Sequence, residues 1–232
     1  MAKYKEIVSM VLDELKITSD DSIFTEGHII FLAGRYRSFL LKQRYYTDLK
    51  KQIPQSNYQT LCLNLETVEA IEGMACEYGY YLRTTEPIPD LLPFGNTRLY
   101  AAGSYYKGNI EFVTKDRFKY VGDNKWMQNI IYATLDPDGK IYLTSSNPQF
   151  LYLEKANLTG IFEDSEKASE LECDNKGNTE NCDILDRNFP IEDSLIAPLI
   201  ELITKELSPS IAAPEDKAND ANDNLSPEPQ SR

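Results

Sequence analysis

Residues 24–46 read FTEGHIIFLAGRYRSFLLKQRYY, and this stretch predicts one long helix that is apolar on two opposite sides. Thr25 can cap its start, and Glu26 in the first turn suits the positive end of the helix dipole. An ordinary surface helix has one apolar stripe, so the second must be buried against another layer of this chain or against another subunit. At a helical period of about 100° per residue, the inner face collects Ile29, Leu32, Ala33, Tyr36, Phe39 and Leu40, and the outer face collects Ile30, Phe31, Leu41 and Tyr45, with Gly34 and Ser38 among them.

Two basic ridges separate these faces, one with Arg35 and Lys42, the other with Arg37 and Arg44. An apolar centre with a charged rim is the usual construction of a protein interface. The alternative is that the ridges pair with acidic residues of the same chain, where each exposed pair adds little stability. We expect the inner face to pack on the first and last helices and the outer face to contact another subunit. The candidate interface residues are Ile30, Phe31, Gly34, Arg35, Arg37, Leu41, Lys42, Arg44 and Tyr45.

The rest of the chain predicts a single α+β domain over residues 1–207. Its helices are packed with a central antiparallel β-meander that forms a small sandwich or barrel. A polar, acidic segment reads as an exposed excursion, and the last residues bury too little apolar surface to order alone. The expected parts are helices at 4–16, 25–51 and 193–207, a β-rich region at 98–162, the acidic excursion at 163–188 and a disordered tail at 208–232.

The composition limits the class of partner. Acidic residues number 37 against 24 Lys and Arg, which gives a formal net charge of −13. Such a chain lacks the basic footprint of a nucleic-acid binder, although DNA could pass it without sticking. Solubility alone also explains an acidic surface. Fifteen Tyr and nine Phe favour β-structure and extended contact surfaces.

The sequence predicts an intracellular, reducing setting. No stretch approaches the ~20 apolar residues of a membrane span, and the N-terminus is amphipathic, unlike a secretory signal. Cys62, Cys76, Cys173 and Cys182 show no CxxC spacing, which argues against a zinc site. Cys173 and Cys182 could close a disulfide under oxidising conditions, but free thiols are the expected state.

Groups that could carry catalysis are sparse. His28 is the sole histidine and lies at the start of the predicted helix, where a structural or surface role is favoured. The run AspProAspGly at 136–139 resembles the opening of a calcium loop, but the rest of that loop is missing, so a hairpin turn is favoured. We therefore expect no enzyme activity, no catalytic residues, no cofactor and no metal.

The order of these parts resembles the head–tail connector ring proteins of crAss-like phages, which infect Bacteroidota. The segments that carry the resemblance are DDSIFTEGHIIFLAGRYRSFLLKQRYY at 20–46, QTLCLNL at 59–65 and FPIEDSLIAPLIELITKEL at 189–207. The resemblance covers about residues 1–207. It implies a virion component without enzyme activity that assembles in the host cytoplasm. It further implies a ring, commonly a dodecamer, that lies below the portal, contacts other ring or tail proteins and lines the DNA exit channel.

Three features of the chain agree with this resemblance. A two-faced helix suits a ring, an acidic lining would repel DNA phosphates, and a mobile tail can fold against a neighbour. Two alternatives stay open. One is a different tail or capsid-associated structural protein of a phage, and the other is a non-phage intracellular protein-binding module.

Overall fold

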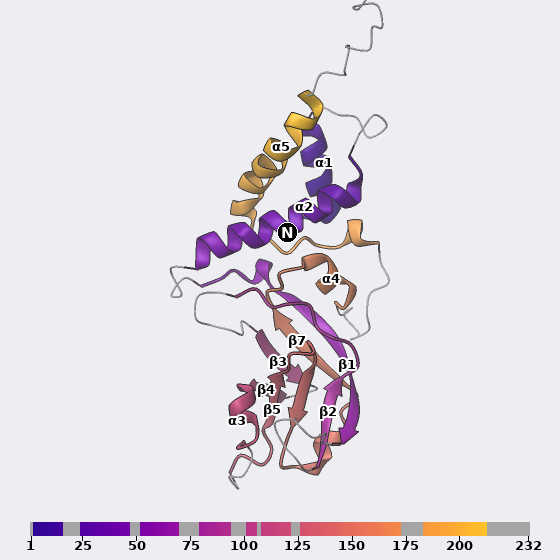
Figure 1. The fold of residues 1–232 in the computed structure, drawn as a ribbon, viewed down its shortest axis with the longest axis vertical. Helices are drawn as coiled ribbons and strands as arrows, with labels where there is room; N and C mark the ends of the chain where they lie inside the picture. Colours follow the sequence, from indigo (N-terminus) through magenta and orange to yellow (C-terminus); the bar gives the residue numbers. More distant parts are fainter. Residues whose placement is uncertain are drawn as a thin grey trace, which may run out of the picture.

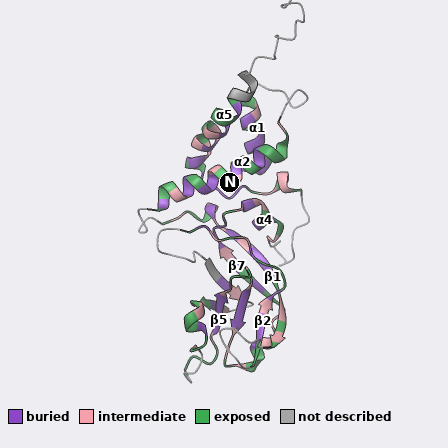
Figure 2. Cartoon of the chain, in the orientation of Figure 1, coloured by how far each residue is buried: buried purple, intermediate pink, exposed green. Residues whose placement is uncertain are grey.

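A computed structural model of the chain shows a helical layer at one end and a closed β-barrel at the other (Figure 1). The predicted α+β class is confirmed, with helices at both ends of the chain and a β-barrel between them. Figure 2 shows that buried positions occur in both parts. The residues that the structure describes are 2–15, 24–46, 52–69, 79–93, 101–105, 108–121, 126–172 and 183–212.

The helical layer contains α1 (Tyr4–Glu14), α2 (Glu26–Tyr45) and α5 (Ile196–Ala212). Each long helix buries an apolar face because its side chains recur at helical spacing. In α2 the Thr25 side chain accepts a hydrogen bond from the backbone N–H of His28 at 3.3 Å, which confirms the predicted cap. Helices α1 and α5 lie on one side of α2, and the barrel lies on the other (Figure 1).

Two predicted helix ends differ from the structure. Helix α2 ends at Tyr45, before the expected end at residue 51, and residues 47–51 lie outside the described part. Helix α5 continues to Ala212, so the expectation of a disordered tail is wrong for 208–212. The buried Leu207 holds the last turns against the core, and the Ser208 hydroxyl donates to the Thr204 carbonyl at 2.7 Å. The remainder of the predicted tail lies outside the described residues.

The barrel has seven strands in the order β1-β2-β6-β5-β4-β3-β7. All described neighbour pairs are antiparallel except β4 and β5, which are parallel with Ile110 opposite Ile131. The expected all-antiparallel meander is therefore wrong at this pair. Parallel neighbours need a crossover connection, which the segment with helix α3 (Lys115–Phe118) provides. The strands are β1 (Gln59–Glu69), β2 (Tyr80–Thr84), β3 (Ala101–Tyr105), β4 (Gly108–Phe112), β5 (Ile131–Leu135), β6 (Ile141–Thr144) and β7 (Lys155–Gly160).

The barrel interior is a second hydrophobic core, separate from that of the helices. Alternate residues of each strand point inward, so the core draws one face from every strand. Gly103 pairs with Ile110 across β3 and β4, and a Cβ at this glycine would lie only 2.9 Å from the Ile110 Cβ. The core residues include Leu61, Leu63, Leu82, Ile131, Ile141, Leu143 and Leu158.

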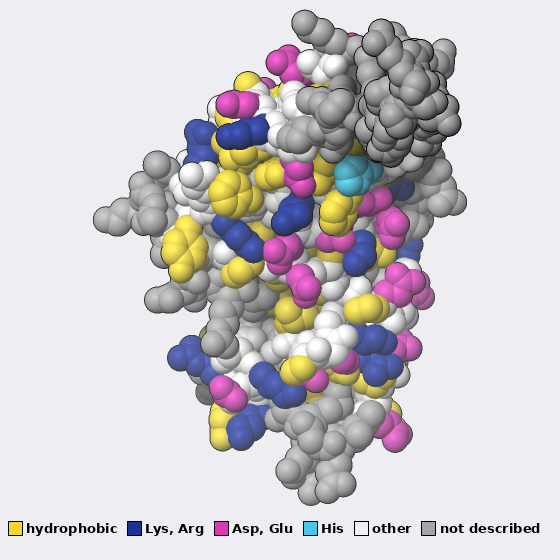
Figure 3. Space-filling model, turned by 45° about the horizontal axis from the view of Figure 1, so that its top comes forward, with side chains coloured by type: hydrophobic (Ala, Val, Ile, Leu, Met, Phe, Trp, Pro, Cys, Tyr) yellow, Lys and Arg dark blue, Asp and Glu magenta, His cyan; other side chains and the backbone are white. Residues whose placement is uncertain are grey.

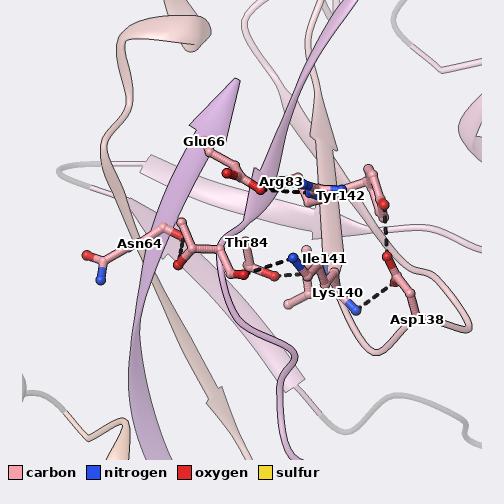
Figure 4. Close-up of polar contacts among 9 residues, drawn as sticks. Asn64, Glu66, Arg83, Thr84, Asp138, Lys140, Ile141 and Tyr142 are labelled. Atoms are coloured by element: carbon pink, nitrogen blue, oxygen red, sulfur yellow. Dashed lines mark hydrogen bonds and ion pairs between the residues drawn. The ribbon is translucent and has the colours of Figure 1, made fainter. Parts of the chain in front are cut away.

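The AspProAspGly run forms the hairpin between β5 and β6, as predicted. The Gly139 N–H donates to the Asp136 carbonyl at 3.0 Å, and Gly139 has a φ of 75°, which favours glycine. The Asp138 carboxylate accepts from the Lys140 N–H and from the Tyr142 hydroxyl, both at 2.9 Å (Figure 4). Asp138 therefore serves the turn itself.

Helix α4 (Ser165–Glu170) lies at the junction between the helical layer and the barrel (Figure 1). This helix falls in the segment that we expected to be an exposed excursion, and that expectation is wrong here, because Ser165, Ala168 and Ser169 are buried. The Asp164 carboxylate caps the helix by accepting from the N–H groups of Glu166 and Lys167 at 3.1 Å. Residues 173–182 of the same segment lie outside the described part.

Candidate functional site

Helix α2 is buried on both of its predicted apolar sides by parts of this chain. On the predicted outer side, Ile30, Leu41 and Tyr45 are buried in the same core as α1 and α5. Because this chain covers them, these three side chains offer little exposed surface for the expected contact with another subunit. The long helix crosses the molecule between two layers, which is why it carries two apolar faces (Figure 1).

Arg37 is the clearest correction to the predicted rim. Its side chain is fully buried, with an exposed fraction of 0%. The guanidinium donates to three backbone carbonyls: Nε to Pro190 at 2.6 Å, Nη1 to Phe162 at 2.8 Å and Nη2 to Asn57 at 3.1 Å. Burial lowers the pKa of Arg37 to about 10, because the charged form loses hydration. Arg37 thus ties α2 to both connections between the layers, through Asn57 before β1 and through Phe162 and Pro190 between β7 and α5. No sequence signal indicated this role.

Two other basic residues of the predicted rim pair within the chain. The Lys42 Nζ lies 2.8 Å from Glu163 Oε1, and the Arg44 Nη1 lies 2.9 Å from Glu192 Oε1. The Tyr45 hydroxyl donates to the other oxygen of the buried Glu192 at 2.6 Å. Burial, together with this bond, raises the pKa of Tyr45 to about 12. The alternative of internal pairing therefore holds for Lys42 and Arg44.

An exposed ridge remains along α2. Phe31 is 60% exposed and Phe39 is 54% exposed, although Phe39 was expected on the inner face. Arg35 lies between them at helical spacing, and Tyr46 follows the helix end. We call Phe31, Arg35, Phe39 and Tyr46 the α2 ridge. Large exposed aromatic side chains that share one face are typical of protein contact surfaces.

A groove lies beside the N-terminal half of the α2 ridge, with a volume of about 250 Å³. Ser38 is buried at its base and donates to the Glu163 carbonyl at 2.7 Å. A Cβ at Gly34 would meet Ser165 Oγ at 3.7 Å, an ordinary contact, so the neighbour of Gly34 is α4 of the same chain. We call this the waist groove, and its lining is Ile30, Phe31, Gly34, Arg35, Ser38, Glu163, Asp164 and Glu166.

The acidic wall of the waist groove contains one carboxylate that differs from its neighbours. Glu163 pairs with Lys42, and Asp164 caps α4 and lies 3.4 Å from the Lys167 Nζ. Within the described part of the chain, the Glu166 carboxylate has no such partner. Burial raises its pKa, and the nearby charges of Asp164 and Glu170 add to the effect. Burial thus disfavours the charged form of Glu166, and a cation placed beside this carboxylate would favour that form. Figure 3 shows acidic, basic and hydrophobic side chains interspersed on the face it presents.

Few groups of the described residues are arranged for chemistry. Among them, no three His, Cys, Asp or Glu side chains are grouped to hold a metal ion. His28 is exposed near the start of α2. None of the described helices is long and apolar enough to cross a bilayer. Cys62 is disulfide-bonded, so the expectation of free thiols is wrong at this position, and the other three cysteines lie outside the described residues.

A two-layer scaffold with exposed aromatic side chains along one helix is typical of proteins that contact other proteins. Residues 6–225 match a family profile described as phage tail ring protein 2. The chain is also 50% identical, over 222 residues, to a protein named Ring protein 2 of Bacteroides phage crAss001, and the match covers 96% of this chain and 97% of that protein. The chain belongs to the phage tail ring protein 2 family. The predicted resemblance is thereby confirmed, and the alternative of a non-phage binding module is set aside.

Proposed function

We propose that this protein is a structural component of the virion that forms a homo-oligomeric ring in the head–tail connector, below the portal. The observation that carries the proposal is the 50% identity to Ring protein 2 across nearly the whole of both chains. The α2 ridge supports it, because exposed Phe31 and Phe39 provide apolar surface that a neighbouring protein can cover.

The ring would line the channel through which the genome leaves. A net charge of −13 supports this, because acidic walls repel DNA phosphates and avoid sequence-specific capture. We propose a dodecamer that contacts the portal and other ring or tail proteins, has no enzyme activity and assembles in the host cytoplasm. We also propose that the described layers fold as one domain, because Arg37 joins them through three carbonyls.

Cryo-electron microscopy of intact particles around the tail vertex tests this proposal. We expect a map in which copies of this fold form one closed ring below the portal, with acidic side chains toward the channel. A ring at another level of the tail would instead support the second candidate function, a different structural protein of the phage tail. The membership of this chain in a family of tail ring proteins favours that candidate. The absence of this chain from purified particles would reject both.

A further inference from the structure

A second exposed surface of the chain is basic and aromatic, and it lies away from the α2 ridge. Arg117, Lys119 and Tyr120 are exposed at the end of α3, and Tyr120 is 68% exposed. The Lys119 Nζ lies 4.9 Å from the centre of the Tyr120 ring, a cation–π contact. We call Arg117, Lys119 and Tyr120 the α3 knob.

The α3 knob has the opposite charge to the chain as a whole. Residues 115–120 carry three cations and one carboxylate, a local charge of +2 in a chain of −13. Lys115 is already paired with Asp136, but Arg117 has no ion-pair partner among the described residues. Exposed aromatic residues that accompany available cations are enriched at protein interfaces. The α3 knob is therefore built to meet an acidic, partly apolar surface.

The waist groove has the complementary chemistry. Phe31 supplies exposed apolar surface, and Glu166 supplies a carboxylate without a partner in the described chain. A volume of 250 Å³ lies below the roughly 300–1,000 Å³ of small-molecule sites, so the groove suits one or two protein side chains. Its acidic wall disfavours nucleic acid, because phosphates would be repelled.

The position of the two surfaces decides how they can meet. Helix α3 lies on the barrel, away from the helical layer, whereas the waist groove lies at the junction between α2 and α4 (Figure 1). A subunit therefore cannot place its own α3 knob in its own groove. Two different patches that join equivalent copies make a heterologous contact, which closes into a ring when the rotation between subunits permits.

We propose that the α3 knob of one subunit docks in the waist groove of the next copy of this chain, with Arg117 against Glu166 and Tyr120 against Phe31. This inference rests on the proposed homo-oligomeric ring and names its contact. The side of the groove formed by the α2 ridge covers the aromatic part of the knob. The carboxylate wall accepts its cations, and salt weakens this part of the contact.

Charge reversal on the full-length purified protein tests the contact, with sedimentation velocity over a range of concentrations as the readout. Arg117→Glu and Glu166→Arg should each weaken self-association by at least about tenfold. The double variant should restore most of it, because the pair is present with exchanged signs. Lys205→Glu and Glu201→Arg on the exposed side of α5 make the same charge changes away from both surfaces. They should associate as the unmodified chain does.

A mixing experiment establishes that the contact is heterologous. Tyr120→Asp removes the knob and Phe31→Asp removes the groove, so each variant alone should be monomeric. Each retains the surface that the other lacks, so an equal mixture should form dimers. Assembly should stop at dimers, because the unused knob of each dimer carries Tyr120→Asp and the unused groove carries Phe31→Asp.

Four results would overturn the proposed contact. The unmodified chain could be monomeric at every concentration, or the double reversal could fail to restore self-association. Tyr120→Asp could assemble as the unmodified chain does, or the α5 control variants could lose as much self-association as the charge reversals. A ring of this protein in the particle map together with any of these results would reject the contact and leave the proposed function standing. A particle map without such a ring would reject the proposed function itself.

Discussion

The Nη1 atom of Arg37 lies 2.8 Å from the carbonyl oxygen of Phe162, and this contact joins the middle of α2 to the segment that leaves β7. The same guanidinium reaches Asn57 before β1 and Pro190 before α5. One buried cation therefore holds both connections between the helical layer and the barrel. It contacts the connection from α2 to β1 once and the connection from β7 to α5 twice. The carbonyl dipoles replace the water that the cation loses on burial.

Replacing Arg37 with Met should destabilise the protein by about 3 kcal/mol, because three buried carbonyls lose their donor while the cost of burying the charge disappears. Urea unfolding followed by circular dichroism measures this loss. Arg35→Met on the exposed ridge of the same helix should change stability by less than about 0.5 kcal/mol. Equal losses in the two variants would contradict the role of Arg37.

Phe31 and Leu41 should respond differently to the same substitution, although both were expected on one outer face. Leu41 is fully buried and Phe31 is 60% exposed. Leu41→Asp should cost more than about 3 kcal/mol, because an unpaired carboxylate enters the core, whereas Phe31→Asp should cost less than about 0.5 kcal/mol. Thermal unfolding of the two variants checks the difference. An equal loss of thermal stability in the two variants would show that Phe31 is not on an exposed face of α2.

Gly103→Ala should destabilise the barrel by about 1–3 kcal/mol, because the added Cβ lies 2.9 Å from the Ile110 Cβ and forces β3 and β4 apart. Gly27→Ala provides the matched control in the first turn of α2. Nothing lies within 4 Å of that position, so the change should stabilise by about 0.5–1 kcal/mol through helix propensity. Denaturant midpoints of the two variants should move in opposite directions, and a neutral Gly103→Ala would disprove the close approach.

Thiol counting tests the disulfide at Cys62. The chain has four cysteines, so a bond between Cys62 and one other leaves at most two reactive thiols. Denatured protein that has not been exposed to reductant should bind at most two equivalents of an alkylating reagent, read by intact mass. Cys62→Ser should release the former partner and raise the count. Four labelled thiols in the unmodified protein would show that the bond is absent.

Patterns that depend on neighbours in the sequence were predicted well. The cap at Thr25, the helical character of α2 and the hairpin at 136–139 follow from local hydrogen-bonding and turn chemistry. The parallel pair of β4 and β5 could not be predicted, because strand neighbours are set by long-range pairing. The predicted inner and outer faces of α2 also failed in part, since Phe39 is exposed and Tyr45 is buried.

The sequence by itself determined the α+β class and that α2 carries two apolar faces, because side-chain periodicity and turn residues act over a few positions. Only the tertiary structure decided what covers those faces. Burial depends on which distant segments meet. Here the connections to the barrel pass over α2 and enclose Arg37, and the core shared by the helices buries Leu41. The same packing leaves Phe31 exposed beside Glu166, so the candidate contact surface is a product of the assembled layers.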